Sequence, residues 1–253
     1  MIGMEAQQYL AFYKPYGVLT AFTDAEGRPT LKNYIDVPGV YPAGRLDFDS
    51  EGMLLLTDDG GLAHRLTDPR FNHPKTYLVQ VEGTVTPQAL ASLAAGVEVK
   101  GQRTRKAQVL EIPAPTLPER AKPVTPHGPT AWLRIVLREG KKRQIRHMTA
   151  AVGLPTLRIV RIAIGPIALG DLQPGEWRLL TPDEVRILKE SVKSAVPERK
   201  PSAKQRPTAG RTAGRYRTDE KPPETNPGGK PAKSRGSARG SRYRSGGRRS
   251  SGR

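Results

Sequence analysis

Residues 44–60 read Gly-Arg-Leu-Asp-Phe-Asp-Ser-Glu-Gly-Met-Leu-Leu-Leu-Thr-Asp-Asp-Gly, a polar segment followed directly by four apolar residues and a turn. An apolar run of that length between turn-forming residues is typical of a buried strand, which we predict at 53–57. The polar segment should then be a loop fixed at the edge of a core. Asp47 is the first candidate for chemistry there, although a loop carboxylate can also form a turn or an ion pair. Asp49 and Glu51 are expected to be structural or to face solvent.

The chain around this loop alternates strand-like and helix-like patterns without an internal repeat. Capping residues, proline at first helical positions and glycine stops mark the helices, whereas β-branched and apolar runs mark the strands. The Pro-rich segment 113–129 is long enough to be a functional excursion. The predicted strands span 9–13, 53–57, 76–82, 107–112, 132–137 and 157–164, and the predicted helices span 61–66, 87–95, 143–152 and a last segment beginning at 181–184. This order indicates a strand-rich α/β or α+β domain.

A second candidate site is a basic segment that follows the fifth predicted strand. Five of the seven positions 141–147 are Lys, Arg or His. A helix beginning here would bring Lys141, Lys142 and Arg143 close to its first N–H groups, a region suited to phosphate. A solvated basic helix face is an equally good interpretation. Arg146 should lie at the border of the buried helix face, where it could meet a carboxylate and keep it ionised.

A third candidate is the run Lys75-Thr76-Tyr77 at the start of the third predicted strand. A tyrosine at a strand start is usually half-buried packing. It could instead offer an aromatic face on which a nucleic-acid base stacks. The pattern alone leaves both interpretations open.

Composition excludes several classes of function. The chain has no cysteine, which excludes disulfides, thiolate metal sites and cysteine nucleophiles, and its four histidines show no metal-ligand spacing. No apolar stretch approaches the roughly 20 residues that cross a bilayer. Residues 1–8 lack the pattern of a signal peptide. We therefore expect a soluble cytoplasmic protein.

The net charge of +18 is unevenly distributed along the chain. Residues 197–253 hold 17 Lys or Arg and 4 acidic residues, which leaves a net charge of +5 for residues 1–196. This tail is rich in Pro, Gly and Ser and nearly free of large apolar side chains, so it is expected to be disordered. Its arginine-glycine pairs favour weak attachment to RNA phosphates, with a solvated linker as the alternative. A polyanion, above all nucleic acid, is the expected partner.

Taken together, these segments resemble the ribosomal RNA pseudouridine synthases of one family, which comprises synthase A for the small ribosomal RNA and synthases B, E and F for the large one. The resemblance covers about residues 9–185, and its most specific parts are Arg45-Leu46-Asp47 and Gln144-Ile145-Arg146. It also includes Tyr13-Lys14-Pro15-Tyr16-Gly17 and Lys75-Thr76-Tyr77. Only about eight residues precede the first predicted strand, so the small S4-type RNA-binding domain of many relatives is expected to be absent. In this respect the chain is most similar to the short type, synthase E.

The resemblance implies an α+β pseudouridine synthase fold over residues 9–192, with a mostly antiparallel mixed sheet and flanking helices and loops around a central RNA-binding cleft. It also implies roles for single residues. Asp47 would be the catalytic carboxylate, and Tyr77 would stack on the target uracil. Arg146 would pair with Asp47, and Arg45 would fill the gap left by the flipped nucleotide. The remaining cations expected at the RNA are Lys14, in a structural or RNA-side role, Lys75, Lys141, Lys142 and Arg143.

We therefore predict site-specific conversion of uridine to pseudouridine in large-subunit ribosomal RNA, by a monomer that uses no cofactor or metal. Naked RNA and a pre-ribosomal particle are both open as the substrate, as are direct attack on the sugar by Asp47 and abstraction of a sugar proton. A non-catalytic RNA-binding or ribosome-assembly protein is the alternative, for which Asp47 would be dispensable. A glycosidase with paired carboxylates fits less well, because Asp47 and Asp49 are only two residues apart on a loop.

Overall fold

The computed structural model describes residues 7–194 and contains every strand and helix that the sequence predicts, with ends that differ by at most two residues. The described strands are β1 (Tyr9–Lys14), β2 (Tyr41–Pro42), β3 (Glu51–Thr57), β4 (Lys75–Glu82), β5 (Glu98–Val99), β6 (Gln102–Arg103), β7 (Gln108–Ile112), β8 (Thr130–Leu137), β9 (Thr156–Ile164), β10 (Ile167–Ala168) and β11 (Trp177–Leu179). The described helices are α1 (Gly60–Thr67), α2 (Pro87–Ala95), α3 (Gln144–Ala151) and α4 (Pro182–Ser194), with 3-10 turns at Leu31–Asn33 and Pro69–Phe71. None of these helices is both long and apolar enough to cross a membrane. The expected basic tail, 197–253, lies outside the described residues.

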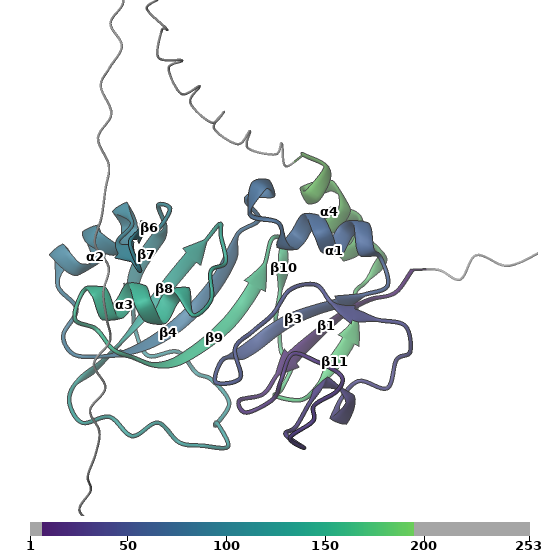
Figure 1. Cartoon of the computed structure of the whole chain (residues 1–253), viewed down its shortest axis with the longest axis horizontal. Helices are drawn as coiled ribbons and strands as arrows, with labels where there is room; N and C mark the ends of the chain where they lie inside the picture. The colour runs from purple at the N-terminus through teal and green to yellow at the C-terminus, as the bar shows by residue number, and fades with distance from the viewer. Residues whose placement is uncertain (1–6, 195–253) are drawn as a thin grey trace, which may run out of the picture. The chain divides into compact units, whose positions relative to one another are not determined.

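Nine of the described strands form one mixed sheet in the order β11–β1–β3–β9–β4–β8–β7, with β2 paired to β3 and β10 paired to β9 (Figure 1). Every pair in this sheet is antiparallel except β3–β9. Strands β5 and β6 form a separate two-stranded hairpin. The α+β class and the mostly antiparallel mixed sheet that the sequence predicts are thus confirmed.

The parallel pair β3–β9 joins two halves of the sheet over only two residue pairs, Glu51–Val160 and Gly52–Arg161. Gly52 permits this close approach. Its φ is +100°, and a Cβ at this position would lie 2.3 Å from the carbonyl oxygen of Arg161. Since glycine alone lacks a Cβ, any other residue here would push β3 and β9 apart. The polar loop 44–50 ends at this junction, directly before β3.

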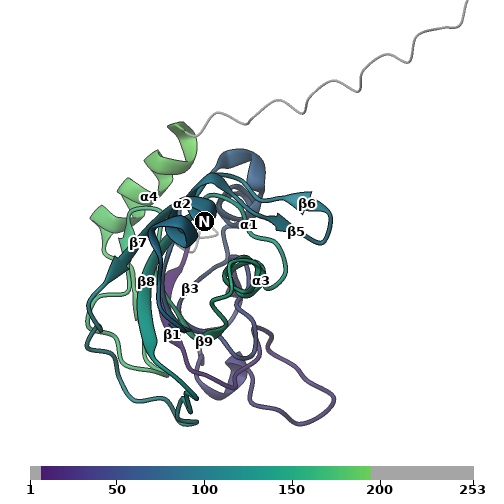
Figure 2. The same cartoon turned by 90° about the vertical axis from the view of Figure 1, so that its left-hand side faces the viewer.

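Helices cover the two halves of the sheet separately, which the two views show (Figures 1 and 2). Helices α1 and α4 pack on one face of β1 and β3, and residues 31–40 cover the opposite face of the same strands. Helices α2 and α3 pack on one face of β4 and β8. Strands β1 and β3 therefore have a hydrophobic core on each face, and β4 and β8 have a separate core under α2 and α3.

The loop that carries Asp47 is anchored by its neighbours. Leu46 is buried in the core that α2 and α3 form with β4 and β8. Thr20 Oγ1 donates to the Leu46 carbonyl oxygen at 2.9 Å and accepts from the Leu46 N–H at 3.2 Å. The N–H of Ser50 donates to the carbonyl oxygen of Asp47 at 3.1 Å, which closes a turn. The backbone of Asp47 is thereby held at the junction.

Candidate active site

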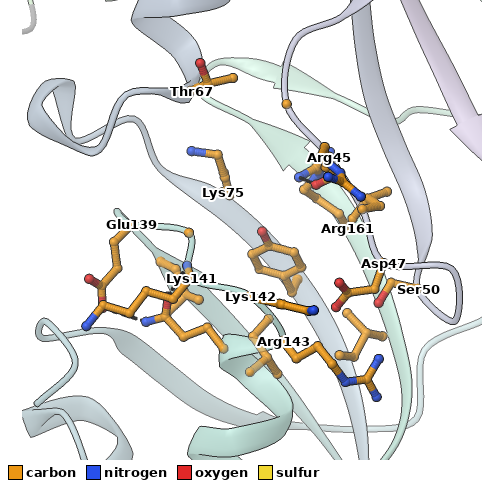
Figure 3. A pocket seen from close by; sticks show the side chains of 18 of the residues that line it. Arg45, Asp47, Ser50, Thr67, Lys75, Glu139, Lys141, Lys142, Arg143 and Arg161 are labelled. Carbon is orange, nitrogen blue, oxygen red and sulfur yellow. Dashed lines mark hydrogen bonds between the residues drawn. The ribbon is translucent and has the colours of Figure 1, made fainter. Parts of the chain in front are cut away.

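A pocket of about 490 Å³ lies beside the junction, which is a size typical of small-ligand sites. Its walls come from residues 43–50, from β4 and β9, and from residues 137–145, which lead into α3. Figure 3 shows Asp47 and Ser50 on one side of the pocket and Lys141 and Glu139 on the other. The charged lining residues are Arg45, Lys75, Lys141, Lys142, Arg143, Arg161, Asp47 and Glu139. Six cations against two carboxylates suit an anionic ligand.

The carboxylate of Asp47 makes no hydrogen bond or ion pair with any residue that the structure describes. Cations nevertheless lie near it. The negative charge of Asp47 acts to raise the pKa of Lys14, Arg143 and Arg146. The side chain is partly exposed and faces the pocket. A carboxylate with a fixed backbone and two free oxygens can attack an electrophilic carbon or accept a proton.

Asp49 engages the two arginines that the basic segment supplies. Arg143 donates from Nη1 and Nη2 to the two carboxylate oxygens of Asp49, at 2.9 and 3.0 Å. Arg146 Nη2 lies 3.1 Å from Asp49 Oδ2 and donates to the Asp49 carbonyl oxygen at 3.0 Å. The predicted ion pair between Arg146 and Asp47 is therefore wrong. The physical reason is that Asp49 offers Arg146 both a carboxylate and a backbone oxygen in one place, which fits the fixed fork of a guanidinium.

These contacts set the ionisation of Asp49. Burial acts to raise the pKa of this carboxyl, but the hydrogen bond from Arg143 and the charges of Arg146 and Arg143 outweigh it, so the pKa lies below its ordinary value. Asp49 is therefore ionised at neutral pH and ties α3 to the Asp47 loop. Its structural role is confirmed, as an ion-pair partner rather than as a turn cap.

Lys14 is fully buried behind this loop. Its Nζ donates to the carbonyl oxygens of Pro15 and Val18 at 2.8 and 2.7 Å. Burial lowers the pKa of Lys14 to about 8, against the charges of Glu51 and the other loop carboxylates, which act to raise it. The predicted RNA contact at Lys14 is wrong, because the ammonium is enclosed by the turn that it stabilises. The structural role predicted as its alternative fits the geometry.

Glu51 is also buried, so the expectation that it could face solvent is wrong. Arg158 donates to it from Nε and Nη2, at 3.0 and 2.8 Å, and both side chains are almost completely enclosed. Arg158 Nη2 also donates to the carbonyl oxygen of Pro118 at 2.9 Å. One buried ion pair therefore links β3, β9 and the Pro-rich segment 113–129.

Tyr77 on β4 and Arg161 on β9 are cross-strand neighbours, and both line the pocket. Directly opposed residues of an antiparallel pair present their side chains on the same face of the sheet. Both residues are buried, with exposed fractions of 8% for Tyr77 and 3% for Arg161. Arg161 Nε donates to the carbonyl oxygen of Met53 at 2.7 Å, across the junction. The tyrosine ring and the guanidinium thus form one floor of the pocket.

The other predicted RNA-binding cations lie at the pocket, and their contact with RNA stays a prediction. Lys141 and Lys142 are exposed, whereas Arg143 is tied to Asp49. Lys75 is half-buried, with Nζ 3.4 Å from the Leu66 carbonyl oxygen. Burial, together with the charge of Arg161, lowers the pKa of Lys75 to about 8. Arg45 also lines the pocket and is partly exposed.

Arg161 and Glu139 are pocket residues that the sequence analysis does not select. Arg158 and Arg161 interrupt an apolar strand three residues apart, and the two-residue period of a strand puts them on opposite faces. That spacing indicates a buried ion pair or a binding site, because a buried arginine on either face of the sheet requires a carboxylate or a site beside it. Glu139 gives no such signal. Its Oε1 accepts from the N–H of Arg105 at 2.9 Å and from the side-chain amide of Gln144.

Comparisons with known proteins place the chain in one family. The model of a protein family described as RNA pseudouridylate synthase matches residues 8–151. A protein of Vibrio parahaemolyticus named ribosomal large subunit pseudouridine synthase E is 50% identical over 179 residues, which cover 70% of this chain and 75% of that protein. A protein of the same name from Xanthomonas campestris is 53% identical over 181 residues, which cover 70% of this chain and 95% of that protein. A crystal structure of a pseudouridylate synthase superposes with a TM-score of 0.62 at 32% identity, over 74% of this chain and 75% of the other.

Proposed function

Because this chain belongs to the RNA pseudouridylate synthase family, we propose that it converts a specific uridine of large-subunit ribosomal RNA to pseudouridine, with Asp47 as the catalytic carboxylate. The observation that carries this assignment is the free carboxylate of Asp47 in a cationic pocket whose floor holds Tyr77. The other loop carboxylates, Asp49 and Glu51, are held in ion pairs. Asp47 is therefore the one acid of the loop that is available to a substrate.

The reaction begins with a uridine that leaves its base stack, at a cost of a few kcal/mol. Asp47 then acts by one of two routes. Its carboxylate bonds to the sugar carbon C1′, or it takes the proton from C2′ while the electrons of that C–H bond form a C1′=C2′ double bond. In both routes the bond between C1′ and N1 breaks, and its electron pair leaves with the uracil ring. The ring turns and C5 bonds to C1′; in the first route the bond between Asp47 and C1′ breaks at this point, and in the second route C2′ takes back its proton from Asp47. The C5 proton is then lost and N1 gains a proton, so that the product is an isomer of uridine.

Tyr77 and the arginines would support these steps in different ways. The buried ring of Tyr77 at the pocket floor offers a face on which the uracil can stack and turn. Arg146 sits behind the loop and fixes Asp49, so that Asp47 keeps its position and its charge. Arg45 lies on the exposed side of the pocket, where it can enter the space left by the flipped nucleotide.

RNA binding would rest on the cations at the pocket rim and on the basic segment 197–253. Lys141 and Lys142 are exposed beside the first turn of α3, so they can reach phosphates without rearrangement. We propose that the protein works as a monomer in the cytoplasm. Its substrate would be free ribosomal RNA or a pre-ribosomal particle, and comparing modification of the two forms by the purified protein decides between them.

The function is tested by mapping pseudouridines in the ribosomal RNA of a strain that lacks this gene. We expect one pseudouridine of the large-subunit RNA to be lost and to return when the full chain is supplied. An RNA with an unchanged set of pseudouridines, in cells whose ribosome assembly is impaired, would instead support a non-catalytic assembly protein.

A further inference from the structure

Arg161 is a buried cation without a counter-charge. Its Nε donates to the Met53 carbonyl oxygen and its Nη1 lies 3.5 Å from the Arg45 carbonyl oxygen, but its Nη2 is buried without a hydrogen-bond partner in the part of the chain that the structure describes. No ion pair with a carboxylate is formed by Arg161 among the described residues. This differs from Arg158 on the same strand, which is neutralised by Glu51.

Lys75 is a second unpaired cation in the same pocket. Within residues 7–194, its hydrogen bonds are two long ones, of 3.4 and 3.5 Å, to the carbonyl oxygens of Leu66 and His73. The two carboxylates of the pocket do not neutralise it, since Glu139 is held by Arg105 N–H and Gln144 and no ion pair joins Lys75 to Asp47 in the described residues. Figure 3 shows Lys75 and Arg161 on the side of the pocket that β4 and β9 form.

Two uncompensated charges in one enclosed site destabilise the free protein, because each is incompletely hydrated and lacks a partner of opposite charge. Such an arrangement is stabilised when an anion enters. On the basis of the proposed function, we propose that Lys75 and Arg161 hold the negative charge of the detached uracil, with Lys75 donating to a carbonyl oxygen of the ring and Arg161 acting through its charge. The electron pair of the broken C1′–N1 bond is the charge that they stabilise.

Position favours the base over a phosphate as the source of this charge. Tyr77 is the cross-strand neighbour of Arg161 and lies two residues after Lys75 on β4, so the two cations flank the face on which the uracil would stack. The phosphates have their own cations in Lys141 and Lys142, which are exposed at the rim. A charge that appears only after bond cleavage would be stabilised in the transition state and not in the bound RNA, which raises the rate without tightening binding.

The first test uses the full chain with a large-subunit ribosomal RNA transcript that carries tritium at uridine C5. Lys75→Met removes the charge at nearly constant size, Lys75→Arg keeps it, and Lys32→Met is a matched change at an exposed lysine outside the pocket lining. We expect Lys75→Met to lower the single-turnover rate by about 10²-fold, with Kd for the RNA within about twofold of wild type. Lys75→Arg should retain most of the rate, and Lys32→Met all of it.

The pH profile gives a second readout. Arg161 on β9, His73 before β4 and Glu139 and Lys141 after β8 face Lys75. If the protonated amine is needed, kcat/KM of the wild type falls as pH rises through about 8. Lys75→Arg should shift that fall to higher pH. Lys14, whose pKa is also about 8, is common to both proteins and does not contribute to the difference.

A paired test at Arg161 covers the case in which Lys75→Met does not fold. Arg161→Lys and Arg161→Met both lose the Nε bond to Met53, so the ratio of their single-turnover rates isolates the charge, and we expect about 10-fold or more in favour of lysine. Equal rates in this pair, or a wild-type rate for folded Lys75→Met, would overturn the proposal. So would a weaker Kd with a smaller salt dependence for Lys75→Met, because that result assigns the charge to a phosphate. If Asp47→Asn is inactive in the same assay, only this proposal fails and the proposed function stands.

Discussion

Arg146 forms its ion pair with Asp49, at 3.1 Å between Nη2 and Oδ2, whereas Asp47 two residues earlier has no ion pair within the described residues. The two aspartates of this loop thus have different roles. Asp49 anchors the loop to α3 through Arg143 and Arg146, and Asp47 keeps its oxygens free in the pocket. A carboxylate bound by two arginines would be a poor nucleophile and a poor base, so this division is a condition for the chemistry.

Asp49→Asn should therefore impair catalysis without touching the substrate. Loss of the carboxylate charge frees Arg143 and Arg146, and the nearest remaining carboxylate for them is Asp47. We expect the single-turnover rate to fall by about 10²-fold, the size of effect that a small misplacement of a reacting group produces. Arg186→Gln, which removes the two exposed ion pairs of Arg186 on α4, is a suitable control. A wild-type rate for Asp49→Asn would contradict the anchoring role.

The ion pairs of Asp49 also predict a pH dependence of stability. The pKa of Asp49 in the folded protein lies below its ordinary value of 3.8. As the pH falls, the unfolded chain therefore takes up this proton at a higher pH than the folded protein. The stability that this carboxylate contributes is present above its ordinary pKa and is lost as pH falls through the folded pKa. The difference in free energy of unfolding between wild type and Asp49→Asn should thus shrink as the pH falls below the ordinary pKa of 3.8 and through the lowered pKa of the folded protein. Urea titrations at several pH values measure it, and a constant difference would contradict the assignment.

Glu51→Gln should destabilise the protein strongly. The change leaves Arg158 as an unpaired buried charge, and breaking such a pair costs about 3–5 kcal/mol. In the double variant Glu51→Gln, Arg158→Met, the unpaired charge is gone, so part of the stability should return. Thermal or urea unfolding of the wild type and these two variants tests this. If both single and double variants unfold like the wild type, the pair does not hold the junction.

Gly52→Ala should be the most damaging glycine substitution at the junction. The new Cβ would lie 2.3 Å from the Arg161 carbonyl oxygen, which has no freedom to move away within the β3–β9 pair. Gly27→Ala is the matched control, because Gly27 also has a positive φ, of +71°, but no atom within 4 Å of its Cβ position. We expect Gly52→Ala to be less stable than Gly27→Ala by about 1–3 kcal/mol or more. Equal stabilities, measured in urea, would show that the two half-sheets can separate without cost.

The regular elements could be predicted from the sequence because their patterns are local. The apolar run before Asp58, the Thr86 cap with Pro87, and the glycine after α2 each carry their signal within a few residues. The short strand β11 carries none, since Trp177–Leu179 becomes a strand only by pairing with β1. Pairing with a strand that is distant in sequence decides whether such a segment forms a strand.

The site could be predicted only in part for the same reason. Asp47 and Tyr77 lie in contiguous motifs, but the partner of Arg146 depends on which of two acids in one loop faces α3. A spacing of two residues does not determine that choice. The spacing of Arg158 and Arg161 marks Arg161 as a buried arginine, but its place in the pocket depends on Tyr77 across the β4–β9 pair, 84 positions away in the chain. The buried state of Lys14 likewise arises from the turn 15–18 folding over it.

If Asp47 performs the isomerisation, its carboxylate must be needed for loss of the C5 proton and not for RNA binding. Purified full-length wild type and Asp47→Asn are each incubated with the large-subunit ribosomal RNA transcript labelled with tritium at uridine C5, and the released tritium is counted beside the Kd for the same RNA. We expect release by the wild type that stops at the amount for a specific site, and no release by Asp47→Asn at an unchanged Kd. Tritium release by Asp47→Asn at the wild-type rate would show that Asp47 is not the catalytic residue.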